Sequence, residues 1–576
     1  MLITCNILRS PLLPTTGVSV PPYPHKSNGH GAPLPWLLAV LTLAALVALP
    51  VLVVAANLLA PSDGTWTHLA GTVLGAYVGN SLLLMGGVGI GVAAGGVGTA
   101  WLVTMCRFPC SRPLEWALLL PMAMPAYVVA YAYTGLLDYA GPVQGALRAL
   151  FGWRSARDYW FPDIRSLGGA VAVMVMVLYP YVYILARAAF LEQSVCVLEA
   201  SRTLGRGPWR AFSQVALPLA RASIIAGIAL ALMETLNDFG TVQYFAVNTF
   251  TTGIYRTWLG LGQPAAAAQL GAVLMGFVAL LIAAERLSRG GAKSHHTTTR
   301  YRRLPRIALP GWRGLLALGF CALPVLVGFV LPAGMLAAWT LEVGLAASFG
   351  GDFATLAGNS LVLALGAGLT AVAVAVVLAY AQRLHPYPVV RLAVRVAALG
   401  YAVPGSVIAV GILVPLVAAD RWLARAVEGW TGASPGLLLT GTVFALVYAY
   451  LVRFLAVSAG SVEASLAKVT PSLEAAARTL GCGTVAALRR VHLPMIKGSL
   501  LSAVLLVFVD VMKELPATLI MRPFNFDTLA TRTFTLASDE RLAESGAPAL
   551  AIVLVGLIPV LLLSRAIAKS RPGESE

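Results

Sequence analysis

Four acidic side chains lie inside strongly apolar stretches of this sequence. Glu234 and Asp238 match Asp510 and Glu514 farther along the chain, with the same offset in numbering for both pairs. An ionised carboxylate near the centre of a bilayer costs roughly 2.5–3.5 kcal/mol on insertion scales, so such residues usually have a function. Because residues i and i+4 share a helical face, each pair is predicted to form one acidic stripe. Two facing stripes would line a path for a hard cation, which prefers oxygen ligands.

The same carboxylates also have a purely structural explanation. They could hold helices together, with Lys513 and nearby backbone groups as partners, or cap breaks in the helices near Gly240 and Pro516. Six tyrosines offer a similar choice, because phenol oxygens are possible ligands of ferric iron. Tyrosine is enriched at membrane interfaces, which favours an interfacial position for each of them. The six are Tyr127, Tyr131, Tyr133, Tyr179, Tyr181 and Tyr183.

A polar segment that occurs twice precedes each pair of acids. The first island is Leu198-Glu-Ala-Ser-Arg-Thr-Leu-Gly205, with Val215-Ala-Leu-Pro218 beginning ten residues after the glycine. The second island is Leu473-Glu-Ala-Ala-Ala-Arg-Thr-Leu-Gly481, with Val491-His-Leu-Pro494 at the same distance. Each predicts a short helix, a glycine turn and a second amphipathic helix. Two equivalent units on one membrane face suit a dimeric partner. The residues predicted to couple to it are Glu199, Ala200, Arg202, Gly205, Leu217, Pro218, Glu474, Ala476, Arg478, Gly481, Leu493 and Pro494.

Composition places the chain in a membrane. Of 576 residues, 58% are hydrophobic and 11% are charged, too few charges to cover a soluble protein of this size. The net charge of +16 lies mostly in short loops on alternate sides of the apolar runs, which argues against nucleic-acid binding. Twelve runs are long enough to cross roughly 30 Å of hydrocarbon. They lie near 36–60, 73–105, 114–137, 167–190, 221–245, 265–287, 314–341, 357–381, 393–419, 436–457, 498–521 and 546–568.

The distribution of arginine and lysine predicts the orientation. The linker 288–313 and both islands are basic, whereas the alternate loops near 61–70, 246–264 and 342–356 have almost no Lys or Arg. The positive-inside rule therefore puts the islands, the linker and both termini in the cytoplasm. Residues 1–35 contain seven prolines and no long apolar run, and are predicted to be a disordered cytoplasmic tail. A short cytoplasmic tail, 569–576, is expected at the other end.

The two halves of the chain, 36–287 and 314–568, repeat one another beyond the islands. Gly79-Asn-Ser-Leu82 returns as Gly358-Asn-Ser-Leu361, and Pro125-Ala-Tyr-Val-Val-Ala130 returns as Pro404-Gly-Ser-Val-Ile-Ala409, with one common offset for the two pairs. An even number of spans in each half keeps the two copies in the same orientation. The predicted fold is an all-α polytopic membrane protein of two parallel six-helix repeats, fused into a twelve-span pseudo-dimer.

The sequence carries no sign of a nucleotide site or a cysteine-based metal site. A phosphate-binding P-loop needs Gly-x4-Gly-Lys-Ser/Thr, and no lysine that precedes Ser or Thr here follows a glycine. If transport is active, another chain must supply the energy. Cys106 and Cys110 are the only close cysteine pair among six, and we interpret their spacing as incidental.

The two islands resemble the EAA loops of bacterial ABC importer permeases. Asp238-Phe-Gly-Thr-Val-Gln-Tyr-Phe-Ala-Val-Asn-Thr-Phe-Thr-Thr-Gly-Ile-Tyr-Arg-Thr-Trp258 and Lys513-Glu-Leu-Pro-Ala-Thr-Leu-Ile-Met-Arg-Pro-Phe-Asn-Phe-Asp-Thr-Leu529 resemble the two halves of the ferric iron permeases. The resemblance covers nearly everything after residue 36. It implies a bacterial inner-membrane permease, no cofactor bound by this chain, a periplasmic binding protein that delivers iron(III), and a cytoplasmic ATPase dimer that uses ATP and grips both islands.

Two alternatives stay open. Fused thiamine permeases share this architecture, and permeases for other small solutes share the islands. An ATP-independent ion-coupled carrier or channel would explain the buried acids and the missing P-loop, but not two matched cytoplasmic islands.

The second island also departs from the family pattern, which places Glu six residues before the glycine, as in Glu199. There Ala475 stands instead, and Glu474 is one residue, about 100° of helix, away.

Overall fold

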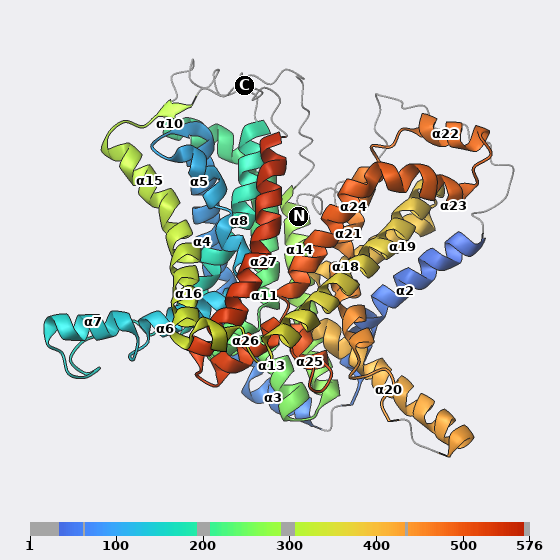
Figure 1. Cartoon of the computed structure of the whole chain (residues 1–576), viewed down its shortest axis with the longest axis horizontal. Helices are drawn as coiled ribbons and strands as arrows, with labels where there is room; N and C mark the ends of the chain where they lie inside the picture. The colour runs from blue at the N-terminus through green and yellow to red at the C-terminus, as the bar shows by residue number, and fades with distance from the viewer. Residues whose placement is uncertain (1–33, 62–63, 193–207, 290–305, 433–435, 570–576) are drawn as a thin grey trace. The chain divides into compact units, whose positions relative to one another are not determined.

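The computed structural model describes residues 34–61, 64–192, 208–289, 306–432 and 436–569 (Figure 1). Residues 1–33 of the predicted tail 1–35 therefore lie outside the described residues, as do most of the linker 288–313 and most of the tail 569–576. The last two residues of the predicted N-terminal tail begin helix α2 (Leu34–Ala56). Within the described residues, eleven helices are long and apolar enough to cross a membrane, and one sharply bent helix pair brings the total to twelve. The expectation of an all-helical polytopic membrane protein is confirmed.

The described residues form two compact units. Unit 1 takes residues up to 56, 361–511 and 521–523. Its elements are α2 (Leu34–Ala56), most of α18 (Phe353–Leu384), α19 (Pro388–Ala397), η6 (Ala398–Ala402), α20 (Gly405–Thr431), α21 (Val443–Leu466), α22 (Pro471–Thr479), α23 (Thr484–Ala487), η7 (Leu488–His492) and nearly all of α24 (Leu493–Met512). Figure 1 shows α22 and α23 at one end of this unit, and the free end of α20 at the other.

Unit 2 takes 57–360, 512–520 and the residues from 524 onward. Its N-terminal elements are η1 (Asn57–Leu59), α3 (Thr65–Thr72), α4 (Leu74–Met105), β1 (Cys106–Arg107), α5 (Ser111–Ala117), η2 (Leu120–Ala123), α6 (Ala126–Leu137), α7 (Pro142–Phe151) and α8 (Leu167–Glu192). After the first island come α10 (Pro208–Ala211), η3 (Phe212–Ala216), α11 (Leu217–Asn237), α12 (Gly240–Tyr244), α13 (Phe250–Tyr255), η4 (Arg256–Gly260) and α14 (Pro264–Arg289). The last are β2 (Ile307–Ala308), α15 (Trp312–Val325), η5 (Leu326–Val330), α16 (Leu331–Val343), α17 (Leu345–Ser348), α25 (Pro516–Met521), α26 (Leu529–Ser538) and α27 (Leu542–Lys569).

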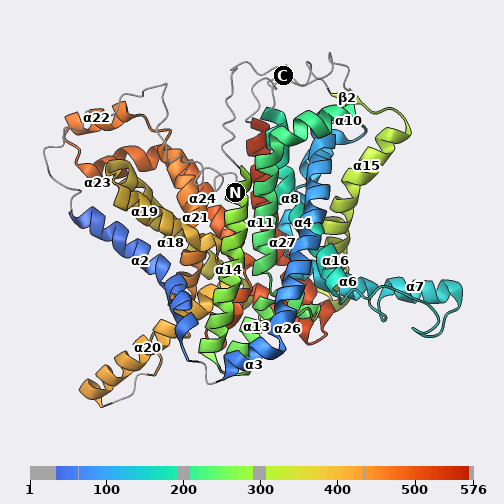
Figure 2. The ribbon, with the colours of Figure 1, turned by 180° about the vertical axis from the view of Figure 1, so that it is seen from behind.

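Helices α4, α8 and α11 make the core of unit 2, and α14 packs against α11 (Figures 1 and 2). Helix α4 contains nine glycines, which let neighbouring helices approach its backbone closely. Such packing replaces the hydrophobic effect as the force that holds helices together in lipid.

The compact units do not coincide with the sequence halves, because the first span of each half packs against helices of the other half. Helix α2 packs on α19 and α20 of unit 1, and Tyr448 on α21 donates a hydrogen bond to the Leu46 carbonyl on α2. Helices α15 and α16 pack instead on α4, α6 and α27 of unit 2, where Tyr133 donates to the Val327 carbonyl. The apolar runs in the sequence do not specify which neighbour each helix chooses.

Four predicted spans are interrupted: 221–245 and 498–521 break after α11 and α24, and two others break at a proline. The run 114–137 is bent by 92° between Ser111–Ala123 and Ala126–Phe151, because Pro125 interrupts the helix. The run 393–419 is likewise divided before Pro404: α19 and η6 come first, and α20 continues to Thr431. Both breaks coincide with a proline in the sequence.

Structural details recur at matched positions of the two halves. Asn80 donates its side-chain N–H to the Asn248 carbonyl, and its counterpart Asn359 donates to the Asp527 carbonyl. Thr249 and its counterpart Thr528 each begin a helix with a capping box. The π-helical turns η3 and η7 are also counterparts, each directly before the span that follows an island.

The end of the linker is attached to the first half. Strand β2 pairs in parallel with β1, and these two-residue strands are the only sheet in the described residues. Arg306 contacts one carboxylate oxygen of Glu115 at 2.8 Å, and Arg187 on α8 contacts the other at 2.8 Å. Glu115 and Arg187 are both buried, so this ion-pair network ties the linker to α5 and α8. Cys106 is a buried free thiol and Cys110 an exposed one.

Candidate functional site

The second island is a helix–glycine–helix unit, as its sequence predicts. Pro471 occupies the first turn of α22, where its missing N–H is not needed. The helix ends at Thr479, and Gly481 adopts a left-handed φ of +79° that lets the chain reverse into α23. The π-turn η7 then leads into α24 at Leu493, and Pro494 lies in the first turn of that helix.

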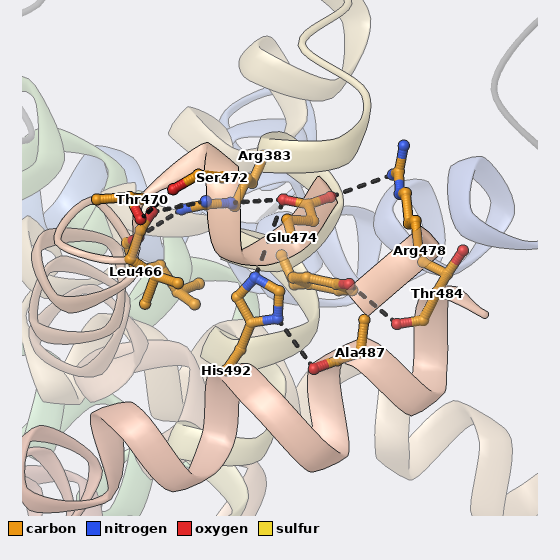
Figure 3. A network of polar contacts seen from close by, with 11 residues as sticks. Arg383, Leu466, Thr470, Ser472, Glu474, Arg478, Thr484, Ala487 and His492 are labelled. Carbon is orange, nitrogen blue, oxygen red and sulfur yellow. Dashed lines mark hydrogen bonds and ion pairs between the residues drawn. The ribbon is translucent and has the colours of Figure 1, made fainter. Parts of the chain in front are cut away.

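Glu474 fastens this island to its own chain (Figure 3). Its carboxylate lies 3.4 Å from Arg383 Nε on α18 and 3.1 Å from Arg478 one helical turn on. Arg383 also donates to the backbone carbonyls of Leu466 and Val469. The side chain of Glu474 is only 14% exposed, so the acid serves an internal contact. Glu474, which stands one residue before the family position, therefore pairs with arginines of its own chain.

A buried histidine supports the same corner. His492 Nδ1 lies 3.1 Å from the Ala487 carbonyl, which places the ring proton on Nδ1. Its Nε2 is 3.9 Å from Glu474, and its ring meets Tyr380 edge to face. The Tyr380 hydroxyl donates to the Thr484 carbonyl and so holds α23.

The outer surface of the second island carries several exposed aliphatic side chains beside exposed Arg478. Leu480 is 84% exposed and Val485 65% exposed, and Leu473 and Ala476 are exposed on the same short helix pair. Burial, with the nearby charge of Arg478, lowers the pKa of His385 below its ordinary value, so this ring is neutral at pH 7. The surface therefore presents aliphatic side chains and the Arg478 guanidinium, whereas Glu474 is mostly covered.

The first island falls largely outside the described residues. Glu199, Ala200, Arg202 and Gly205 are among the residues not described. The structure describes its last part, where η3 leads into α11 at Leu217 and Pro218 stands in the first turn.

The predicted acidic stripes are wrong, because both helices end before the second acid. Helix α11 stops at Asn237, and α24 stops at Met512. Asp238 instead accepts hydrogen bonds from the backbone N–H groups of Thr241 and Val242, each at 3.1 Å. These bonds satisfy donors that the start of α12 leaves unpaired.

Glu514 repeats this arrangement at the matching position of the second half. It accepts from the backbone N–H of Ala517 at 2.9 Å and of Thr518 at 3.0 Å, at the start of α25. The hydroxyl of Thr518 also donates to it, as the hydroxyl of Thr241 does to Asp238. Asp238 and Glu514 therefore form matched caps at two breaks within the apolar runs. The signal in the sequence was an acid followed three or four residues later by threonine.

The other two acids remain on helices. Glu234 lies on α11, three residues before its end, and its charge acts on Asp238. Asp510 lies on α24, two residues before its end. Both are partly exposed, and Glu234 belongs to unit 2 whereas Asp510 belongs to unit 1.

The six tyrosines differ in burial and in the partners of their hydroxyls, and the expected interfacial position stays a prediction. All except Tyr133 are buried in unit 2. Tyr179 donates to the Leu118 carbonyl and Tyr183 to the Glu115 carbonyl, so these two hold α8 against α5 and η2. The polar backbone of the bent segment thus gives these two hydroxyls partners inside the protein.

Comparison with known proteins agrees with this architecture. Residues 87–290 match the family described as the inner membrane component of binding-protein-dependent transport systems. The chain is thus a permease of an ABC import system, a transport subunit and not an enzyme. The matched residues include the first island and the break at Asp238.

Individual relatives extend the similarity over most of the chain. The Fe(3+)-transport system permease protein FbpB 2 of Haemophilus influenzae is 27% identical over 84% of this chain and 89% of its own length. The molybdenum transport permease ModB of Escherichia coli is 32% identical, over 27% of this chain and 63% of its own. The sulfate transport permease CysT of E. coli is 31% identical, over 26% of this chain and 50% of its own.

Proposed function

We propose that this permease imports iron(III), which a binding protein delivers and a separate ATPase drives across the membrane. The iron assignment is supported by the similarity to an Fe(3+) permease, which extends over most of both chains. The relatives named for molybdenum and sulfate cover much shorter parts. Thiamine and other small solutes are the alternative substrates.

The structure of the second island supports the proposal that another chain supplies the energy for transport. It is a helix–glycine–helix unit whose acid is bound internally and whose exposed surface includes aliphatic side chains, as at Leu480 and Val485. Burying an exposed leucine such as Leu480 in an apolar groove of a partner would stabilise the complex. An ATPase dimer would grip the two islands, contacting the first also through Glu199.

We further propose parallel repeats with the islands and both termini in the cytoplasm. The caps, asparagine bonds and π-turns that recur at matched positions support two copies with the same orientation. On this topology the stretch 246–262 faces the binding protein in the periplasm.

The four membrane acids take two roles in this proposal. Asp238 and Glu514 hold the turns that break the apolar runs, and so bring polar backbone into the membrane. Glu234 and Asp510, one turn earlier, supply negative charge to the cation path.

ATP hydrolysis by the reconstituted complex tests the substrate assignment. Permease, ATPase and binding protein would be incorporated in nanodiscs, and hydrolysis measured with the binding protein empty or loaded. Stimulation by the iron(III)-loaded protein supports the proposal. Stimulation by a thiamine-loaded binding protein, with none by iron, would assign the alternative substrate.

A further inference from the structure

Three tyrosine rings form a cluster beside the two breaks of unit 2. Tyr127 and Tyr131 lie one turn apart on α6, and Tyr244 ends α12. The ring centroids of Tyr127 and Tyr131 are 5.7 Å apart, and those of Tyr131 and Tyr244 are 4.6 Å apart. All three side chains are buried, with at most 9% of any residue exposed.

Two hydroxyl groups of this cluster are not used by the fold. Those of Tyr127 and Tyr131 are buried without a hydrogen-bond partner among the described residues, and so is the Gln243 side-chain oxygen. The Tyr244 hydroxyl interacts with the Thr134 hydroxyl, which itself donates to the Ala130 carbonyl. Burying a hydroxyl without a partner costs free energy, so such a group in a native protein calls for a bound water, an ion or a functional role.

Both capped breaks approach this cluster. The charges of Asp238 and Glu514 both act on the Tyr127 hydroxyl. Gly240, just after the first break, lies so close that an added Cβ would be 2.6 Å from Tyr127 Cβ and 2.8 Å from Leu515 of the second break. Glycine is therefore required at 240 for the two breaks to meet at α6.

We propose that Tyr127, Tyr131 and Tyr244 form a transit site that binds ferric ion through their phenol oxygens as it crosses the membrane. This inference rests on the iron(III) function proposed above. A trivalent hard cation prefers oxygen ligands. In the described part of the chain, His, Cys, Asp and Glu do not come together in groups of three that could hold a metal, so the phenols are the concentrated oxygen donors.

The binding step balances without a free proton. A ferric ion lowers the pKa of its bound water and so carries hydroxide. When a phenol replaces that hydroxide, an Fe–O(phenolate) bond forms, the phenol proton joins the leaving hydroxide, and water departs. Asp238 and Glu514 keep their capping bonds and stabilise the positive charge from a short distance. The second half has Ser406 and Val410 where α6 has Tyr127 and Tyr131, so the site belongs to the first half alone.

The test compares phenol removal at used and unused hydroxyls. The double variant Tyr127→Phe/Tyr131→Phe removes two unpartnered hydroxyls. Tyr133→Phe is the matched control on the same helix, because the Tyr133 hydroxyl donates to the Val327 carbonyl. Iron uptake per inserted molecule is expected to fall about tenfold or more in the double variant, since a charged ligand loses polar contacts. Its thermal stability should not fall, whereas that of Tyr133→Phe should, with normal uptake per molecule.

A spectroscopic readout separates binding from transport. Ferric citrate added to the purified permease in nanodiscs should produce a visible phenolate-to-iron absorption band in the wild type and in Tyr133→Phe. The band should be much weaker in the double variant, which keeps only Tyr244 of the three phenols. Normal uptake and an unchanged band in the double variant overturn the transit site while leaving the iron function intact. Absence of iron uptake by the wild type and the control overturns the proposed function, and this inference with it.

Discussion

Arg383 is the residue on which the geometry of the second island depends most. Its guanidinium contacts Glu474 at 3.4 Å and donates to the carbonyls of Leu466 and Val469, from a side chain that is 20% exposed. A hydrogen bond from a charged group contributes about 1.5–3 kcal/mol when buried. Water can replace part of this loss at the membrane surface, so Arg383→Met should destabilise the island locally by about 2 kcal/mol.

Hydrogen exchange measures that loss directly. About 2 kcal/mol corresponds to roughly 30-fold faster exchange of amides that open locally. The expected result is faster exchange in 470–492, with little change in α4 and α8, which belong to unit 2. Lys468→Met is the control, because Lys468 is exposed and close to the same corner. If Arg383→Met exchanges amides of 470–492 as slowly as the wild type, Arg383 does not hold the second island in place. A coupling energy of zero between Arg383 and Glu474 in a double-mutant cycle would refute their pairing.

Substitutions at three other places have distinct expected outcomes. Gly481→Val should weaken ATPase association in a pull-down more than Gly481→Asn. No atom lies within 4 Å of a Cβ added at 481, but a backbone φ of +79° strains a β-branched residue by about 1–2 kcal/mol. Equal binding of the two variants would contradict this reason. Asp238→Ala should lower the free energy of unfolding by about 1–2 kcal/mol, measured by thermal unfolding, because its capping hydrogen bonds are lost. Glu234→Gln should leave stability unchanged and reduce uptake per molecule. The reverse pattern would assign the structural role to Glu234 and the transport role to Asp238. A cysteine at Leu261, 58% exposed, should react with an impermeant thiol reagent in intact cells while one at Thr298 does not, and the opposite labelling would invert the topology.

The local pattern of residues along the sequence was enough to predict part of the fold and of the site. Apolar runs of sufficient length identified the membrane segments, and glycine at 481 predicted the turn of the second island. The ends of α11 and α24 were missed as helix ends, although the capping alternative named Gly240 and Pro516. The prediction of a continuous acidic stripe rested only on the i, i+4 spacing of the acids. In the structure, the second acid of each pair instead accepts hydrogen bonds from backbone N–H groups of α12 or α25.

Features that depend on contacts between distant segments could not be predicted in this way. Arg383 and Glu474 are 91 residues apart, and nothing in their spacing indicates a pair. The packing of α2 on α19 and α20 depends on matching surfaces of apolar helices, which look alike in sequence. Tyr131 and Tyr244 likewise come together only because α12 turns back beside α6.

Uptake of radioactive iron into proteoliposomes tests the central claim most directly. The permease would be reconstituted with its ATPase inside and the iron(III)-loaded binding protein outside. Iron should accumulate only when ATP is present on the ATPase side, and Gly481→Val should reduce this accumulation. Accumulation that is equally fast without the ATPase would identify an ATP-independent carrier and contradict the account.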